Sequence, residues 1–274
     1  MSNRCGDAEG SVALYWDFEN LHANLCEVAQ GEGAYGKPDN RFKVQEPLVD
    51  VQALVELAVS FGPVAINRAY CNWQYFGRYR DALMQNAVEL VQLFPPGGSA
   101  KNGADIRLCL DAVEDLARFG HIATVMVVGG DSDFMPVAQK IKAMGRTLVG
   151  VGARASTNRH WARSCHEFHY YEDVLERAAE AAQAPVAAAL APGAAPVRPL
   201  DPAAEVFRRA VQLLAQARGD SWVETAAVWR MMQRLDPTFD PREHGYADFR
   251  SLVQAQAALV ELRDQEPNQY IRLR

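Results

Sequence analysis

Four aspartates in this sequence are placed where their carboxylates could bind a metal ion together. Asp17 directly follows a short apolar run, and Asp131 and Asp133 follow another apolar run just past two glycines. Asp105 stands at the start of a stretch whose apolar residues recur with helical spacing. Carboxylates repel one another unless a cation lies between them, and hard divalent cations take oxygen ligands. The four residues together therefore predict a divalent-metal site.

A site of this kind predicts hydrolysis at phosphorus, because a bound divalent cation lowers the pKa of a water molecule and stabilises the attacking and leaving oxygens. The chemistry needs no histidine or cysteine ligand, and the acidic cluster contains neither. Asn20 and Asp111 are candidate supporting residues. Each polar residue also has an ordinary interpretation, since an Asp or Asn after a strand often caps a helix or forms a turn. Asp111 could equally be an exposed helical residue.

Guanidinium, ammonium and hydroxyl groups near the predicted strand ends and loops could hold the phosphates of a substrate. Taken singly, each such residue is as readily explained as part of the solvated surface. The candidates for substrate binding are Arg68, Lys101, Ser132, Arg154 and Thr157.

The elements that must position these residues alternate between strands and helices. Such alternation predicts an α/β fold with a mostly parallel sheet flanked by helices, in which ligands sit at the carboxyl ends of the strands. The polar, glycine-rich stretch 31–44 is expected to be a mobile insertion. Strands are expected at 12–16, 64–70, 89–94, 124–128 and 147–151, and helices at 106–119 and 134–144.

An Ala/Pro-rich stretch, residues 178–202, predicts a linker between a domain at 1–177 and a smaller domain at 203–274. The smaller domain is expected to have three helices followed by a hairpin, which is typical of a winged-helix arrangement. Its helices are expected at 203–217, 223–235 and 249–257, and its strands at 258–263 and 270–273.

Composition limits the function classes. The net charge is −6, so nucleic-acid binding would rest on local basic patches or on metal ions. The five cysteines are odd in number and form no CxxC pair, which argues against a disulfide framework or a zinc site. No apolar run approaches the roughly 20 residues that span a bilayer, and the first ten residues lack an apolar signal core. A cytoplasmic protein without a membrane partner is expected.

Four segments in this order resemble the NYN domain of the LabA type, over roughly residues 11–175. They read LYWDFENL, KNGADIRLCLDAVEDL, MVVGGDSDFMPVAQKIKAMGRTLVGVG and SCHEFHYYEDV. The resemblance implies a PIN-like nuclease fold with clustered aspartates and Mg²⁺ or Mn²⁺. Trp16, the stretch 31–44 and the single residue between Lys101 and Gly103 depart from the usual pattern. The matching family positions are Asp17, Asn20, Lys101, Asp105, Asp111, Asp131 and Asp133.

The C-terminal part resembles an OST-HTH (LOTUS) domain, a family associated with RNA binding and protein docking. The resemblance rests on Trp222, the predicted helix 228–235, Pro237, Phe239, Pro241, the Gly245-Tyr246 pair and Phe249. It implies RNA, single-stranded or structured, as a partner, and a possible protein partner through this domain.

The resulting hypothesis is a metal-dependent (endo)ribonuclease that hydrolyses RNA with a water activated by Mg²⁺ or Mn²⁺. The alternative is a non-catalytic RNA-binding or regulatory adaptor that retains the NYN fold. A phosphatase of the haloacid dehalogenase kind would want a second Asp two residues after Asp17, where this chain has Glu19. The sequence leaves open the RNA target, RNA against DNA, endo- against exonucleolytic action, and the oligomeric state.

Overall fold

The computed structural model describes residues 10–94, 103–179, 201–218, 221–265 and 268–274. The chain divides into two compact units, Met1–Leu175 and Glu176–Arg274, called here the N-terminal and C-terminal units. Most of the predicted linker, 178–202, lies outside the described residues. No described helix is both long and apolar enough to cross a bilayer.

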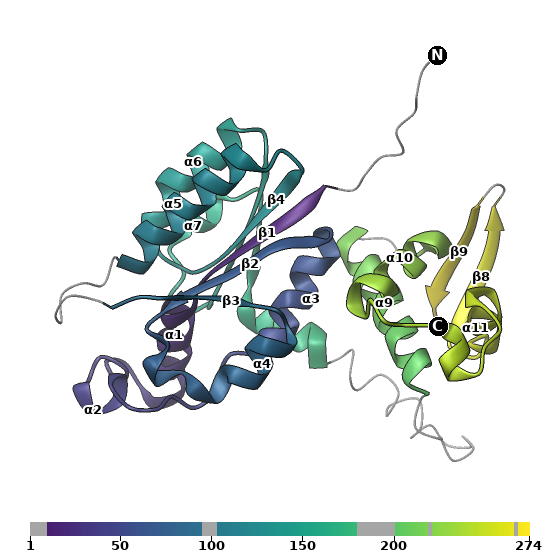
Figure 1. The fold of residues 1–274 in the computed structure, drawn as a ribbon, viewed down its shortest axis with the longest axis horizontal. Coiled ribbons are helices and arrows are strands. Elements are labelled where there is room, and N and C mark those ends of the chain that lie inside the picture. Colours follow the sequence, from purple (N-terminus) through teal and green to yellow (C-terminus); the bar gives the residue numbers. More distant parts are fainter. Residues whose placement is uncertain (1–9, 95–102, 180–200, 219–220, 266–267) are drawn as a thin grey trace. The chain divides into compact units, whose positions relative to one another are not determined.

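Six parallel strands form one sheet in the N-terminal unit, which confirms the predicted α/β fold (Figure 1). The strand order is β3-β2-β1-β4-β5-β6, so the chain runs outward from β1 in one direction and from β4 in the other. The boundary between β1 and β4 is the topological switch point, where open sheets of this kind bind ligands. The strands are β1 (Ser11–Asp17), β2 (Val64–Cys71), β3 (Glu89–Gln92), β4 (Ile122–Val128), β5 (Thr147–Gly152) and β6 (Glu167–Tyr170).

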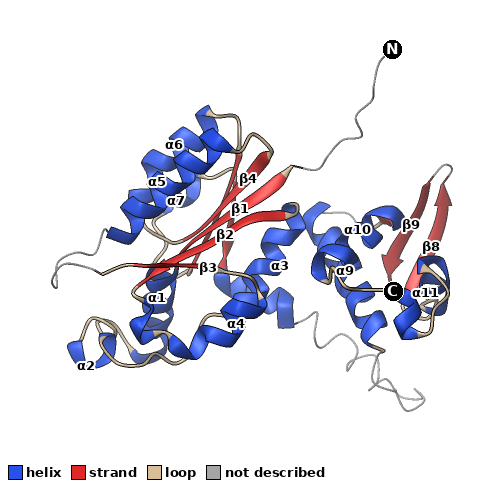
Figure 2. Ribbon diagram, viewed as in Figure 1, coloured by secondary structure: helices blue, strands red, loops and turns tan. Residues whose placement is uncertain are grey.

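Helices cover both faces of this sheet (Figure 2). Successive side chains of β1 point to opposite faces. Leu14 and Trp16 pack in one core with α1, α3 and α4, and Ala13 and Tyr15 pack in the other with α5, α6 and α7. The central strand is therefore apolar on both faces, as a buried parallel strand must be. The helices are α1 (Phe18–Gln30), α2 (Pro38–Arg41), α3 (Val51–Phe61), α4 (Arg80–Gln85), α5 (Gly103–Arg118), α6 (Met135–Ala143) and α7 (Arg159–Ser164).

The stretch 31–44, expected to be a mobile insertion, is instead folded against α1. Ala34 and Tyr35 are buried, and both backbone N–H groups donate to the Glu27 carboxylate, each at 3.0 Å. The stretch also contains the short helix α2. Groups in this stretch form hydrogen bonds with α1. Composition alone does not show whether polar groups bond to another element or to water.

The C-terminal unit has the three predicted helices and an antiparallel sheet, β7-β9-β8. The short strand β7, which pairs with β9, was not predicted, because two residues show no alternating pattern. The helices are α9 (Pro202–Arg218), α10 (Thr225–Leu235) and α11 (Phe249–Ala255), and the strands are β7 (Val223–Glu224), β8 (Val260–Gln265) and β9 (Asn268–Leu273).

A set of charged and phenolic side chains fixes α5 on the sheet. Tyr15 Oη donates to Asp115 Oδ2 at 2.8 Å, and Arg68 donates to the same oxygen at 2.9 Å. Tyr70 Oη donates to Asp111 Oδ2, one turn earlier on α5, also at 2.8 Å. Two successive turns of α5 are thus held by residues of β1 and β2. The position of the first turn, which carries Asp105, follows from these contacts.

We expect Arg68→Met to lower the free energy of unfolding by about 3–5 kcal/mol, because the buried Asp115 carboxylate would lose its cation. Chemical denaturation of the full-length protein measures the loss. Arg107→Met is the matched control, since Arg107 is largely exposed and pairs with Asp111 within one helix. Such an i,i+4 pair contributes only about 0.3–0.5 kcal/mol. Equal losses for the two variants would contradict the anchoring role of Arg68.

Candidate metal centre

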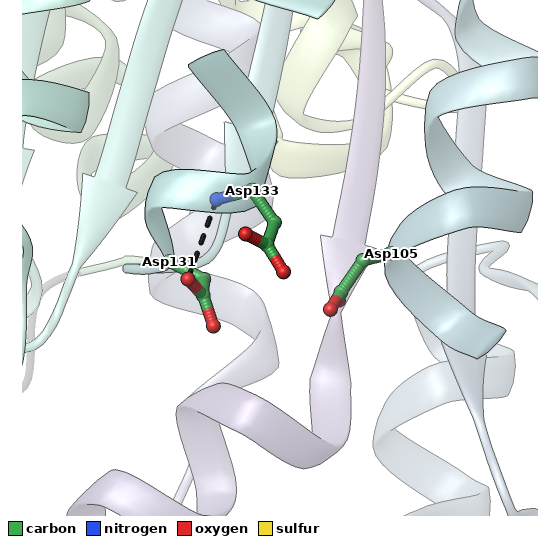
Figure 3. Close-up of side chains that lie close together, drawn as sticks. All are labelled: Asp105, Asp131 and Asp133. Carbon is green, nitrogen blue, oxygen red and sulfur yellow. Dashed lines mark hydrogen bonds between the residues drawn. The ribbon is translucent and has the colours of Figure 1, made fainter. Parts of the chain in front are cut away.

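Three carboxylates converge at the carboxyl end of the sheet (Figure 3). One oxygen each from Asp105, Asp131 and Asp133 lies within 4.8 Å of the others. Asp105 comes from the first turn of α5, and the other two come from the turn that follows β4. The close-up shows the three side chains pointing toward a common point between these elements.

Asp17 lies next to this triad at the end of β1. Its side chain is buried and shares a hydrogen bond with the Asp105 carboxyl. Its Oδ1 also accepts from the Asn20 backbone N–H at 3.3 Å, which caps α1. Asp17 therefore both caps α1 and belongs to the acidic cluster. The four aspartates of the predicted metal site thus lie together in the structure.

The turn after β4 is held rigidly beneath Asp131. The Gly129 carbonyl accepts from the buried Trp161 indole N–H at 2.8 Å, and the Gly130 carbonyl accepts from Asn158 N–H at 2.9 Å. A Cβ at Gly129 would lie 2.6 Å from the Phe134 ring, so only glycine fits there. Asp131 Oδ1 in turn accepts from the Asp133 backbone N–H at 3.3 Å. The turn after β4 thus places both carboxylates near Asp105, and Asp131 lines the crevice.

The electrostatics of the cluster favour a cation. Burial raises the pKa of Asp17 well above its usual range, and the nearby Asp105 charge raises it further. Burial also raises the pKa of Asp105; the hydrogen bond from Asp17 opposes this shift, and the Asp131 and Asp133 charges add to it. A proton held by Asp17 and Asp105 relieves part of the repulsion, and a divalent cation would relieve more of it.

The donor set fits a hard divalent ion. Every ligand oxygen is a carboxylate, and the partial exposure of Asp131 and Asp133 leaves room for water and substrate phosphate, which Mg²⁺ usually retains as ligands. The crevice beside the cluster encloses about 450 Å³. Asp17, Asn20, Asp105 and Asp131 line it, so the cluster opens onto a space large enough for part of a substrate.

Three of the supporting and substrate-binding candidates lie elsewhere. Asp111 accepts hydrogen bonds from Tyr70 and Arg107, and Arg68 pairs with Asp115 and Glu89, so both belong to the anchor of α5. Arg154 pairs with Asp173, and its guanidinium stacks over the Tyr170 ring at 4.3 Å.

The remaining candidates lie nearer the cluster or outside the described residues. Thr157 donates to the Ala153 carbonyl at 2.7 Å and packs against Gly130. Ser132 lies between the two aspartates and donates to Asp131 Oδ1 at 3.3 Å. Lys101 lies outside the described residues.

Residues that the sequence did not single out form the opposite side of the crevice. They are Asn24, Tyr35, Arg41, Asn72 and Phe94. Glu19, expected from the sequence to be a solvated side chain, also lines the crevice and accepts hydrogen bonds from Tyr35 and Arg41. Tyr35 and Arg41 belong to the stretch expected to be mobile. The helical spacing of Glu19, Asn20, Asn24 and Glu27 on one face of α1 is the one available signal for a polar wall.

The fold and the acidic cluster define a nuclease-like α/β protein. The sequence matches the NYN domain family over residues 11–175, and the chain belongs to this family of PIN-like nucleases. Residues 202–272 match the OST-HTH/LOTUS domain, a domain type that suggests RNA binding. Both resemblances seen in the sequence are therefore confirmed.

Individual relatives add little about activity. An uncharacterized protein of Methanocaldococcus jannaschii is 32% identical over 105 residues, which are 38% of this chain and 40% of the relative. The match thus spans less than half of the length of that curated relative. A crystal structure of a protein of unknown function from Vibrio parahaemolyticus has a TM-score of 0.48 at 19% identity, covering 64% of this chain and 98% of that one.

We expect Asp17→Asn to raise the melting temperature of the metal-free protein at neutral pH by a few degrees. Asparagine keeps the cap of α1 but removes a buried carboxylate beside Asp105. A carboxyl whose folded pKa is raised binds more protons in the folded state, so metal-free wild type loses stability as pH rises from about 4 through that raised pKa. The variant should lose less over this range.

Scanning calorimetry in EDTA between pH 4 and pH 8 measures this difference. Asp111→Asn is the matched control, because it weakens the hydrogen bonds from Tyr70 and Arg107 and should lower the melting temperature. A lower melting temperature for Asp17→Asn at neutral pH would contradict electrostatic strain at Asp17.

Proposed function

We propose that this protein is a metal-dependent ribonuclease that hydrolyses RNA phosphodiester bonds with Mg²⁺ or Mn²⁺. The observation that carries the proposal is the convergence of Asp105, Asp131 and Asp133 within 4.8 Å, with the buried Asp17 alongside. Gathering these carboxylates costs folding free energy unless a cation is bound, so the cluster is explained by metal binding and not by stability.

The residues have separate tasks in this proposal. Asp105, Asp131 and Asp133 would hold the ion, one oxygen from each. The buried Asp17 lies beside Asp105 and, once ionised, would add its negative charge to the site. A bound divalent ion supplies a water of lowered pKa and positive charge at the phosphate. Asp133 is the most exposed of the three carboxylates.

RNA as the substrate is supported by the domain composition. A nuclease-like NYN domain and an OST-HTH/LOTUS domain share one chain, and the second suggests RNA binding. In the C-terminal unit, the Arg272 guanidinium lies 4.7 Å from the Trp222 ring centroid, and that of Arg263 lies 6.0 Å away. A surface with arginines beside an aromatic ring suits RNA, whose bases stack and whose phosphates attract cations. Docking of a protein partner by this unit is the alternative role.

We expect wild-type protein to cut labelled single-stranded RNA in the presence of Mg²⁺ or Mn²⁺, and not in EDTA. Asp131→Asn and Asp17→Asn should lower the cleavage rate at least about 100-fold, because the first removes a ligand and the second removes a buried carboxylate beside the ligands. Gel-resolved cleavage of linear and circular RNAs is the measurement. Cutting of the circular RNA establishes endonucleolytic action.

Asp81→Asn is the control for this experiment, because Asp81 is exposed on α4 and does not line the crevice. It should cleave as wild type does. If wild type left every RNA intact with either metal while still binding it, the nuclease proposal would fail, and the non-catalytic adaptor would be the better description. Equal cleavage by wild type and Asp131→Asn would place the chemistry outside this cluster.

A further inference from the structure

The crevice beside the aspartates has a second wall that the proposed chemistry does not use. It is formed by one face of α1, by the stretch 31–45, and by residues that follow β2 and β3. The polar and aromatic members of this wall are Asn24, Tyr35, Arg41, Asn72 and Phe94. We call this set the outer wall.

The part of the outer wall that belongs to the stretch 31–45 is held in place by α1. Two carboxylates of α1 hold the stretch 31–45. Glu27 accepts from the Ala34 and Tyr35 backbone N–H groups, and Glu19 accepts from Tyr35 Oη at 3.2 Å and Arg41 Nε at 3.1 Å. The Gln45 amide, itself buried, donates to the Asn40 carbonyl at 2.7 Å and closes the far end of the stretch. Because these contacts already fix the stretch 31–45, this part of the wall loses little conformational entropy when a ligand binds.

The outer wall offers an aromatic face and neutral amides to the crevice. Phe94 is 78% exposed and lines the crevice, so its ring is accessible to a ligand there. Asn24 and Asn72 carry amide groups that both donate and accept hydrogen bonds. A flat, uncharged, hydrogen-bonding ligand satisfies both features at once.

The charges of the described lining residues favour a neutral group over a phosphate in this part of the crevice. Glu19 and Glu27 lie in the lining, and the Arg41 guanidinium is already paired with Glu19. Among the described lining residues, a phosphate would meet these carboxylates and no cation that is not already paired. The volume of about 450 Å³ falls within the range of about 300–1,000 Å³ that small-ligand sites occupy.

We propose that the outer wall binds one unpaired nucleobase of the RNA, adjacent to the phosphate that lies at the aspartates. The base stacks on Phe94, and the Asn24 and Asn72 amides face its polar edge. Asp105 and Asp131 line the same crevice, so the next phosphate along the strand reaches the acidic cluster. A base within a duplex is already stacked and paired, so the wall selects RNA that is single-stranded at this nucleotide. The inference rests on the proposed ribonuclease function for the identity of the neighbouring group.

Binding of RNA that cannot be cut tests this subsite separately from catalysis. The protein is full-length Asp131→Asn in Mg²⁺, and the probes are a fluorescent single-stranded oligoribonucleotide and a series in which one position at a time is abasic. Phe94→Ala should weaken binding of the intact oligonucleotide about tenfold or more, because stacking on an aromatic side chain contributes that much per base. The exposure of Phe94 means that the variant should fold normally.

The decisive readout is the coupling between the two changes. At the position that occupies the subsite, removing the base should abolish the effect of Phe94→Ala, since both changes delete one contact. Asn24→Ala should show the same coupling at the same position. Phe119→Ala is the control, because this partly exposed ring follows the end of α5 opposite to Asp105 and should change nothing.

Two results would overturn the subsite. One is intact RNA bound equally well with and without Phe94. The other is a Phe94→Ala effect that adds to the abasic effect at every position. The outcome is independent of cleavage by wild type. Coupling without any cleavage would support the subsite and contradict the ribonuclease proposal. Cleavage without coupling would contradict the subsite alone.

Discussion

Carboxylates gathered at the switch point of the sheet repel one another, and the N-terminal unit must hold them together against this repulsion. Burial and proximity raise the pKa of Asp17 and Asp105, so the metal-free cluster favours keeping a proton. A sequence selected for stability alone would place neutral side chains there. The proposed metal ion would offset this cost, and the partial exposure of Asp131 and Asp133 would leave it accessible to water and phosphate.

The rest of the N-terminal unit holds these charges together against their repulsion. The hydrogen bonds of Asp111 and Asp115 with residues of β1 and β2 prevent α5 from moving Asp105 away. On the other side, Trp161 holds the Gly129 carbonyl and so fixes the turn after β4. Two charged residues that looked like site residues in the sequence, Arg68 and Asp111, thus act at a distance from the crevice. The first turn of α5 thus carries Asp105 of the candidate site, and later turns carry Asp111 and Asp115, which anchor the helix to the sheet.

The sequence predicts the sheet and the cluster well because both follow from short-range patterns. Apolar runs identify buried strands, and an aspartate at the end of such a run lies at the ligand-binding edge. It predicts β6 and β7 poorly, since short edge strands lack a distinctive pattern. The stretch 31–44 was wrongly expected to be mobile because its order depends on Glu19 and Glu27 in another element. Whether Arg68 faces the crevice or α5 is likewise a matter of tertiary contacts, which spacing does not encode.

Calorimetric titration of the full-length protein with Mn²⁺, in two buffers of different ionisation enthalpy, tests the central claim most directly. If the aspartates form a metal site, wild type binds Mn²⁺ at pH 7 with release of protons from Asp17 and Asp105, and binds it more tightly as pH rises. Asp131→Asn should then lose most of this binding. An absence of binding heat at every pH in wild type, or equal binding by Asp131→Asn, would contradict the account.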